Sequence, residues 1–179
     1  MAVKNNDIIL AMKEHPDKGF RLLMATYKEP VYWHIRRLVV THADAQDATQ
    51  ETFVRIFRSF DRFNESGSFT AWIYKIATNE ALRILSRYHE EQLSLDYEAA
   101  DAGGIMADTY VDYGDLESIK LQNAILSLPA KQQIAFNLRY YDELDYEEIA
   151  EVTGSTVSAA KANYHIAKDK IIQYMNSHD

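Results

Sequence analysis

The sequence predicts an all-α protein with two small helical domains, an N-terminal helical bundle and a C-terminal helix-turn-helix, joined by an acidic flexible linker. Only three prolines and six glycines interrupt the 179 residues. Almost every apolar stretch repeats at steps of three and four, which is the period of an amphipathic helix. The exception is residues 89–118, which have no sustained period and carry nine acids without a Lys or Arg.

The aperiodic stretch sets the expected domain boundaries. Its like charges repel one another, which keeps such a segment extended. We therefore expect domains at 1–88 and 116–179 and a linker at 89–115. The linker is either a solvated spacer or an acidic strand that occupies a basic channel on a partner.

Helices are expected in order along both domains. An apolar stripe covers residues 20–39, Thr41 starts a new unit, and a second stripe covers 53–60. The turn-rich loop 61–68 precedes a long helix from about 69 to about 87. Periodicity resumes near Leu116, and apolar stripes mark a helix before Pro129 and another ending near Tyr141.

A helix-turn-helix is expected at the C-terminal end. Asp145 can cap its first helix with Glu148 at the capping-box position, Gly154 suits the turn, and Ser155 or Thr156 can cap the second helix. The second helix of such a unit can enter a DNA major groove. Helix pairs joined by a glycine turn also occur in all-α proteins that never bind DNA, and this segment alone leaves both readings open.

Composition narrows the classes of function. The chain has no cysteine, which removes disulfides and thiolate chemistry. No apolar run approaches a membrane span and the N-terminus lacks a signal-peptide pattern, so we expect a soluble, cytoplasmic protein without membrane insertion. The formal charge is −8, whereas independent DNA binders are usually basic. Either the chain does not bind nucleic acid, or a partner supplies much of the affinity.

A polar stripe follows one side of the long helix. It consists of Lys75, Asn79, Arg83 and Arg87, four residues apart, with Trp72 and Tyr74 at its start. Cations follow phosphates, and aromatic rings stack on unpaired bases, so the combination favours single-stranded nucleic acid. The alternative is a solvated face, with Trp72 packed in the core.

No catalytic or cofactor motif is present. The sequence lacks a phosphate-binding glycine loop, HExxH, GxSxG and a dinucleotide fingerprint, and its six histidines lack metal-ligand spacing. We therefore expect no enzymatic activity, no cofactor and no metal.

Two blocks together resemble one family. DAQDATQETFVRIFRSFDRFNESGSFTAWIYKIATNEALRILSR (44–87) is similar to the second conserved region of bacterial extracytoplasmic-function (ECF) sigma factors. LPAKQQIAFNLRYYDELDYEEIAEVTGSTVSAAKANYHIAKDKI (128–171) is similar to their fourth region. The order of the blocks and the linker between them also match. The resemblance implies an initiation subunit whose partners are the core of bacterial RNA polymerase and promoter DNA in duplex and melted form. Members of the family are often held inactive by an anti-sigma factor.

The resemblance also implies roles for residues of the first block. Docking on the clamp helices of the largest polymerase subunit falls to Asp47, Gln50, Glu51 and Phe53. Recognition and melting of the minus-ten element falls to Asn64, Ser66 and Phe69 around a flipped base, and to Trp72, Tyr74, Lys75, Asn79 and Arg83 along the opened strand. The linker would pass toward the RNA exit path of the polymerase.

The second block would read the minus-thirty-five element through its recognition helix. The groove-facing residues implied are Thr156, Ser158, Ala159, Lys161, Asn163 and His165, with Lys168 nearer the backbone. Many family members have Thr-Val-Lys-Ser-Arg where this chain has Ala159 to Asn163, and Arg is common at the position of Ile166. Fewer cations predict a weaker salt dependence for the isolated C-terminal domain.

Three hypotheses follow from these patterns. The leading one is an alternative sigma factor that directs RNA polymerase to a small set of promoters. The second is a stand-alone helix-turn-helix transcriptional regulator that binds operator DNA itself, which would leave the linker and the polar stripe without a role. The third is a sigma-like adaptor that binds partners but lacks promoter activity.

Overall fold

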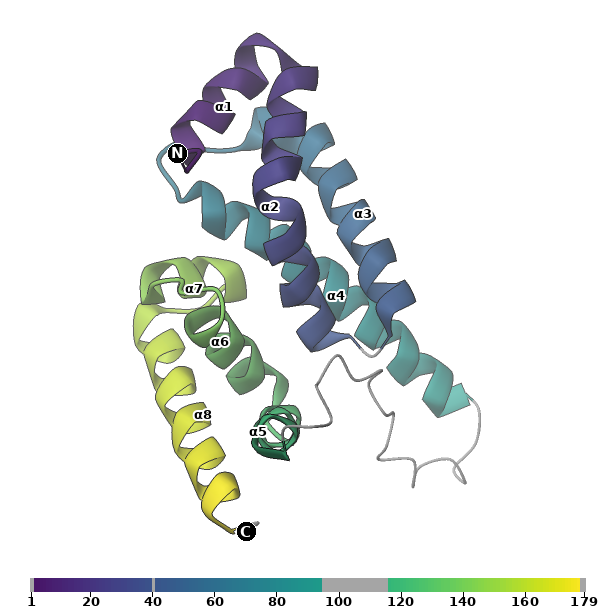
Figure 1. The fold of residues 1–179 in the computed structure, drawn as a ribbon, viewed down its shortest axis with the longest axis vertical. Coiled ribbons are helices and arrows are strands. Elements are labelled where there is room, and N and C mark those ends of the chain that lie inside the picture. The colour runs from purple at the N-terminus through teal and green to yellow at the C-terminus, as the bar shows by residue number, and fades with distance from the viewer. Residues whose placement is uncertain (1, 40, 95–115, 178–179) are drawn as a thin grey trace. The chain divides into compact units, whose positions relative to one another are not determined.

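The computed structural model describes residues 2–39, 41–94 and 116–177, and all regular structure in these ranges is helical (Figure 1). The elements are α1 (Asn5–Glu14), α2 (Pro16–Leu38), α3 (His42–Ser59), the 3-10 turn η1 (Phe60–Arg62), α4 (Phe69–Ser94), α5 (Leu116–Leu126), α6 (Ala130–Tyr140), α7 (Tyr146–Thr153) and α8 (Val157–Ser177). The predicted all-α class is confirmed.

The helices pack as two separate units, α1–α4 (the N-terminal unit) and α5–α8 (the C-terminal unit). In the N-terminal unit α2 contacts α1, α3 and α4; in the C-terminal unit α8 contacts α5, α6 and α7. The long helix α4 continues to Ser94, past the expected end near 87, because no glycine or proline stops it. The rest of the expected linker, residues 95–115, lies outside the described residues.

The close approach of α1 to α2 depends on a glycine. Gly19 is buried where the two helices meet, and a Cβ built there would lie 2.3 Å from the backbone nitrogen of Met12. Pro16 begins α2 at a position where a missing N–H costs nothing. The helix then runs through Pro30, an exposed residue, up to Leu38.

Polar contacts tie α4 to the two helices beside it. His34 of α2, fully buried, pairs through Nε2 with the Thr78 hydroxyl at 2.7 Å. The Thr41 side chain caps α3 by accepting from the Asp44 amide at 3.1 Å, which agrees with the expected start. Asp44 in turn accepts a hydrogen bond from the Tyr88 hydroxyl near the end of α4.

The helix-turn-helix forms as the caps predict. The Asp145 carboxylate accepts from the Glu148 amide at 2.8 Å, Gly154 adopts φ 63° and ψ 34°, and the Thr156 hydroxyl accepts from the Ala159 amide at 3.0 Å. Thr156 rather than Ser155 is therefore the cap of α8. Ala160, Ala167 and Ile171 bury the inner face of α8, whereas Val157, three residues before Ala160, is exposed in the first turn.

None of the helices among the described residues is both long and apolar enough to cross a membrane.

Candidate nucleic-acid interface

The loop between η1 and α4 is held by its own side chains. The Asn64 side-chain oxygen accepts from the Ser66 amide at 3.0 Å and from the Ser66 hydroxyl at 2.8 Å. The Gly67 amide donates to the Asn64 carbonyl at 3.0 Å, and the Ser68 hydroxyl accepts from the Ala71 amide at 3.1 Å as α4 begins. Asn64 and Ser66 are both exposed, so this turn presents two polar side chains to solvent in a fixed geometry.

Three aromatic rings lie beneath this loop. Phe63 lies 5.2 Å from both Phe69 and Trp72, and the Phe69 and Trp72 rings stack at 5.9 Å. Phe69 is buried and meets Tyr27 edge-on, whereas Trp72 is partly exposed. Phe69, expected to line a base pocket together with Asn64 and Ser66, lies below the loop with its ring against Phe63, Trp72 and Tyr27.

A pocket of about 590 Å³ opens between this loop and α1. It is lined by Asn5, Asn6, Ile9, Leu10, Lys13, Phe63, Glu65, Gly67, Ser68 and Phe69, and so by neither Asn64 nor Ser66. Lys13 pairs with Glu65 across its rim. At the other end of α1, Asn5 accepts from the Tyr27 hydroxyl at 2.6 Å and donates to the Thr70 hydroxyl at 3.0 Å. No role was predicted for α1, because no pattern in the sequence links this helix to a loop some sixty residues away.

The stripe on α4 is largely exposed. Lys75, Asn79 and Arg83 face solvent, and so does Arg87. Tyr74 does not: it is 4% exposed and its ring meets the buried His34 edge-on at 5.1 Å. The helical period explains this, because Tyr74 lies three and four residues before buried Ala77 and Thr78 and so shares the inner face of α4. The structure therefore places Tyr74 in the core of the N-terminal unit, whereas the residues of the stripe face solvent.

One acid interrupts the cationic character of the stripe. Glu80 is buried on α4 and pairs with Arg83 at 3.6 Å and with Arg55 of α3 at 2.5 Å. Glu80 follows Asn79 directly and therefore lies outside the four-residue spacing that defines the stripe. The sequence does contain a signal for this pairing. An acid directly follows a stripe residue, and arginines lie on the preceding helix.

The expected docking residues on α3 divide by burial. Asp47 and Gln50 are exposed and Glu51 is partly exposed. Phe53 is buried, with its ring edge-on to Phe20 at 6.4 Å, so it supports α3 from within the unit.

The apolar side chains that α3 does present were missed. Val54 and Phe57 are exposed and follow Gln50 at the three- and four-residue steps of one helix face. The spacing in the sequence would have identified them.

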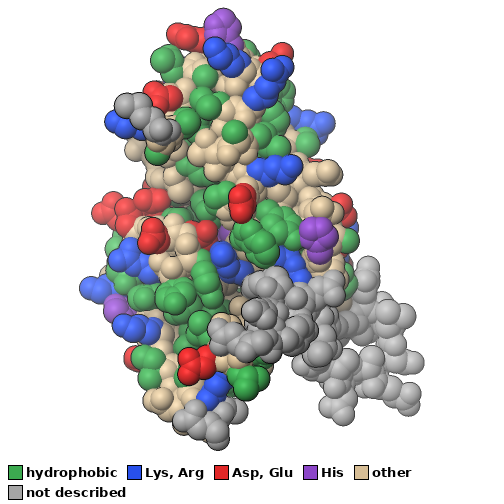
Figure 2. Space-filling model, in the orientation of Figure 1, with side chains coloured by type: hydrophobic (Ala, Val, Ile, Leu, Met, Phe, Trp, Pro, Cys, Tyr) green, Lys and Arg blue, Asp and Glu red, His purple; other side chains and the backbone are tan. Residues whose placement is uncertain are grey.

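The recognition helix presents a polar outer face. Thr156, Ser158, Lys161, His165 and Lys168 are exposed, while Ala159 and Asn163 are partly buried. Figure 2 shows Lys and His side chains along the outer edge of α8.

The start of α7 supports this face. The guanidinium of Arg139 lies 4.9 Å from the centre of the Tyr146 ring, and the Tyr146 ring lies 6.4 Å from that of His165.

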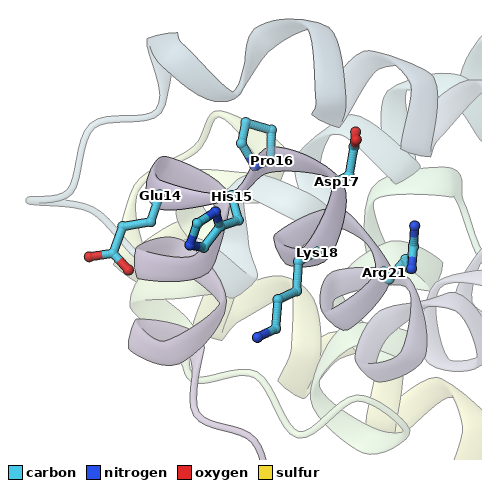
Figure 3. A pocket seen from close by; sticks show the side chains of 6 residues that line it. All are labelled: Glu14, His15, Pro16, Asp17, Lys18 and Arg21. Atoms are coloured by element: carbon cyan, nitrogen blue, oxygen red, sulfur yellow. The ribbon is translucent and has the colours of Figure 1, made fainter.

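A second hollow, of about 700 Å³, lies at the turn between α1 and α2. Its six lining residues are Glu14, His15, Pro16, Asp17, Lys18 and Arg21, whose side chains diverge and carry both signs of charge (Figure 3). It contains none of the residues predicted from the sequence. Among the described residues, no three His, Asp or Glu side chains gather in a way that could hold a metal ion.

Comparison with known families identifies both units. The family model for Sigma-70 region 2 matches residues 23–90, and that for Sigma-70 region 4 matches residues 118–171. The first match covers most of the N-terminal unit, and the second lies within the C-terminal unit.

Relatives that match almost the whole chain carry the same family name. The chain is 29% identical over 173 residues to the ECF RNA polymerase sigma factor SigW of Bacillus subtilis, covering 91% of this chain and 92% of that protein. It is 27% identical to the ECF RNA polymerase sigma-E factor of Haemophilus influenzae, covering 92% and 91%.

Two solved structures share the fold. The sigma factor RpoE, in complex with the anti-sigma factor NepR from Bartonella quintana, matches with a TM-score of 0.74 at 19% identity, over 90% of this chain and 99% of that one. CnrH, in complex with the cytosolic domain of CnrY, matches with a TM-score of 0.73 at 19% identity, over 96% and 97%. With both sigma-70 regions present in the family's order on two helical units, this chain belongs to the extracytoplasmic-function sigma factors of bacterial RNA polymerase.

Proposed function

We propose that the chain acts as an alternative sigma factor, which binds the core of RNA polymerase and directs transcription initiation at a specific set of promoters. The observation that carries this is the pairing, in one chain, of a region 2 unit and a region 4 unit. A helix-turn-helix alone would suit many DNA-binding proteins, but the second helical unit gives the chain a surface for another partner.

Docking on core polymerase is assigned to the exposed face of α3. Asp47, Gln50 and Glu51 supply polar and negative groups, and we add Val54 and Phe57, which place apolar surface beside them. Interfaces of this kind combine apolar contact with a charged rim that guides association. The contacted element would be the clamp helices of the largest subunit.

The minus-ten element is assigned to the loop 63–68 and the outer face of α4. The turn held by Asn64 and Ser66 would face a flipped base, with partly exposed Trp72 beside it. Lys75, Asn79 and Arg83 would follow the opened strand. Phe69 and Tyr74, both buried, would support these groups from the core.

The minus-thirty-five element is assigned to α8. Ser158, Lys161 and His165 project from its outer face, while Thr156 caps its first turn and Lys168 lies further along. Partly buried Ala159 and Asn163 would allow a close approach of the DNA. The acidic linker would pass toward the RNA exit path, an assignment that rests on its sequence.

Core polymerase would supply the attraction to DNA that this acidic chain lacks. With a formal charge of −8, the free protein meets DNA at a disadvantage, and core polymerase would deliver it to the promoter. Of two solved structures with this fold, one is a complex with the anti-sigma factor NepR and the other a complex with the cytosolic domain of CnrY. We infer that this chain too is held by an anti-sigma factor until it is needed.

Reconstitution tests the proposal. The purified chain is added to sigma-free bacterial core polymerase, and co-elution and transcription from its source genome are measured. Co-elution with discrete start sites is expected. Tight binding of duplex DNA by the chain alone, without association with core, would instead support the stand-alone regulator, and co-elution without initiation would support the adaptor.

A further inference from the structure

Polar contacts at both ends of α1 join this helix to the loop before α4 and to the first turn of α4. At its start, the Asn5 side chain accepts from the Tyr27 hydroxyl at 2.6 Å and donates to the Thr70 hydroxyl at 3.0 Å. In its last turn, Lys13 forms an ion pair with Glu65 of the loop. Helix α1 therefore spans the distance from the middle of the loop to the start of α4.

The end of α1 that carries Lys13 is held in place by α2. Gly19 brings α2 so close to the backbone of Met12 that a Cβ there would lie 2.3 Å from the Met12 nitrogen. Met12 itself is buried, and Lys13 follows it directly. Close packing against a main chain leaves little room for movement, so the backbone of Lys13 has a fixed position.

Between the two ends, the pocket of about 590 Å³ separates α1 from the loop. Open space supplies no van der Waals contact that would fix the loop on this side. The side chains of Lys13 and Glu65 are 52% and 55% exposed, so their ion pair contributes little to folding. Breaking the pair should therefore leave the fold intact and change the position of the loop.

Glu65 occupies a special place in the loop, between the two residues proposed to face the flipped base. Its neighbours Asn64 and Ser66 are exposed and are joined by hydrogen bonds of 3.0 and 2.8 Å to the Asn64 side-chain oxygen. Because these bonds make the turn one unit, a shift of Glu65 moves both neighbours. Hydrogen bonds weaken steeply as their geometry departs from the optimum, so a small shift changes how well a base is read.

We propose that Lys13 is a positioning residue that acts through Glu65 to set the geometry of the base-reading turn, so that α1 helps to determine promoter specificity. Lys13 does not touch the base in this arrangement. Helix α1 lies outside residues 23–90, which match the region 2 family model, so this role adds to those of the matched segment. The inference rests on the proposed function, because it takes the role of the turn from it.

The test uses holoenzyme made from core polymerase and the full chain, on a promoter found by reconstitution. Four templates carry each base in turn at the minus-ten position where the wild type discriminates most strongly. The readout is the ratio of run-off transcript from the preferred base to the mean of the other three. Lys13→Glu and Glu65→Lys each place like charges across the rim and should lower this ratio by about two- to five-fold, the range of an exposed ion pair. The double variant Lys13→Glu/Glu65→Lys restores opposite charges and should return the ratio to near the wild-type value.

The controls separate positioning from a general effect of charge. A general charge effect would move total transcription in opposite directions for Lys13→Glu and Glu65→Lys and leave both ratios unchanged. Lys18→Glu makes the same charge change as Lys13→Glu at an exposed site of the α1–α2 turn and should keep the wild-type ratio. Circular dichroism verifies that each variant is folded, and binding to core should not change.

Two results would overturn the inference while the proposed function stands. One is a wild-type ratio in either single variant, and the other is a double variant whose ratio stays as low as that of the single variants. A wild-type holoenzyme that initiates without any base preference in the minus-ten element would instead show that the loop does not read a base, and the inference would fail with that assignment. Absence of initiation by the wild type would be a failure of the proposed function itself.

Discussion

Two glycines constrain the backbone for different physical reasons. Gly154 adopts a left-handed conformation that costs other residues energy, although a Cβ there would meet nothing within 4 Å. Gly19 has ordinary helical geometry, but a Cβ there would collide with the backbone of α1 at Met12. The first site therefore restricts conformation and the second restricts volume, and substitutions should distinguish them.

Gly154→Ala should destabilise the C-terminal unit by roughly 1–2 kcal/mol, because the Cβ of alanine is sterically strained in the left-handed conformation. Gly154→Asn should cost less, since asparagine tolerates that conformation best after glycine. Thermal unfolding monitored by circular dichroism measures both. Equal losses for the two variants would contradict a conformational cause.

Gly19→Ala should destabilise the N-terminal unit by about 1–3 kcal/mol, the usual cost of overpacking, despite the better helix propensity of alanine. The clash is with main-chain atoms, which cannot move aside as a side chain does. Urea unfolding measures the change. Lys18→Ala, at an exposed neighbour on the same helix, is the control and should have little effect.

Burial is where residue-level prediction from the sequence was weakest. Phe53 and Tyr74 were both expected to meet a partner, and both lie in the core. An aromatic residue on an amphipathic helix can face either way, and the decision depends on which helix packs against it. Exposed Phe57 and buried Glu80 were missed too, although the spacing of Phe57 along α3 and the position of Glu80 beside Asn79 were signals in the sequence.

Individual helices act as surfaces whose two faces have separate tasks. The inner faces of α3 and α8 pack within their units, and the outer faces carry the residues proposed to meet polymerase and DNA. A substitution on an outer face should therefore change binding and leave the fold intact.

The double variant Asp47→Lys/Glu51→Lys should weaken binding to core polymerase by about tenfold or more, because it reverses charge within an electrostatically matched interface. Affinity is measured by titrating labelled chain with core. The matched control, Glu14→Lys/Asp17→Lys, makes the same charge change at the α1–α2 turn (Figure 3) and should bind normally. Unchanged affinity in the first variant would exclude α3 as the docking face.

Lys161→Ala should weaken promoter binding by about 1–3 kcal/mol if this side chain contacts a base edge, with core binding unchanged. Run-off transcription from a promoter identified by reconstitution measures the loss. Lys170→Ala is the control on the same helix, since Lys170 donates to Gln132 at 3.0 Å. Equal transcription by wild type and Lys161→Ala would remove this residue from the groove-facing set.

Most helices and several of their caps could be predicted from the sequence, whereas α1 and the long-range pairings could not. Thr41, Asp145 and Gly154 are local signals, and each lies at the expected helix end. The pairing of Lys13 with Glu65 and the link from Asn5 to Thr70 join residues far apart in the chain, and no periodic pattern contains that information. The role of α1 beside the loop emerged only from the fold.

At the scale of the whole molecule, each unit has its own core. In the C-terminal unit Ala124, Ile125, Leu128, Phe136, Ala167 and Ile171 form one buried cluster. In the N-terminal unit the helices converge on α2. Each unit therefore contains the apolar contacts that its own folding requires.

Fragments 1–94 and 116–179 should each fold alone and melt within a few degrees of the corresponding transition in the intact chain. Differential scanning calorimetry of the chain and both fragments measures this, and a non-additive result would show that the units stabilise each other. The shorter fragment should be the less stable, because small domains bury a lower fraction of their surface.

The two tryptophans of the chain, Trp33 and Trp72, both belong to the N-terminal unit. The C-terminal unit contains tyrosines but no tryptophan. Indole emission therefore reports on one half of the molecule alone. Trp72 stacks on Phe69 beside the loop and is partly exposed, so a base stacking there would quench it, while Trp33→Phe would leave it as the single emitter. Under the proposed function, Trp72 emission would therefore report strand opening beside the loop of the N-terminal unit.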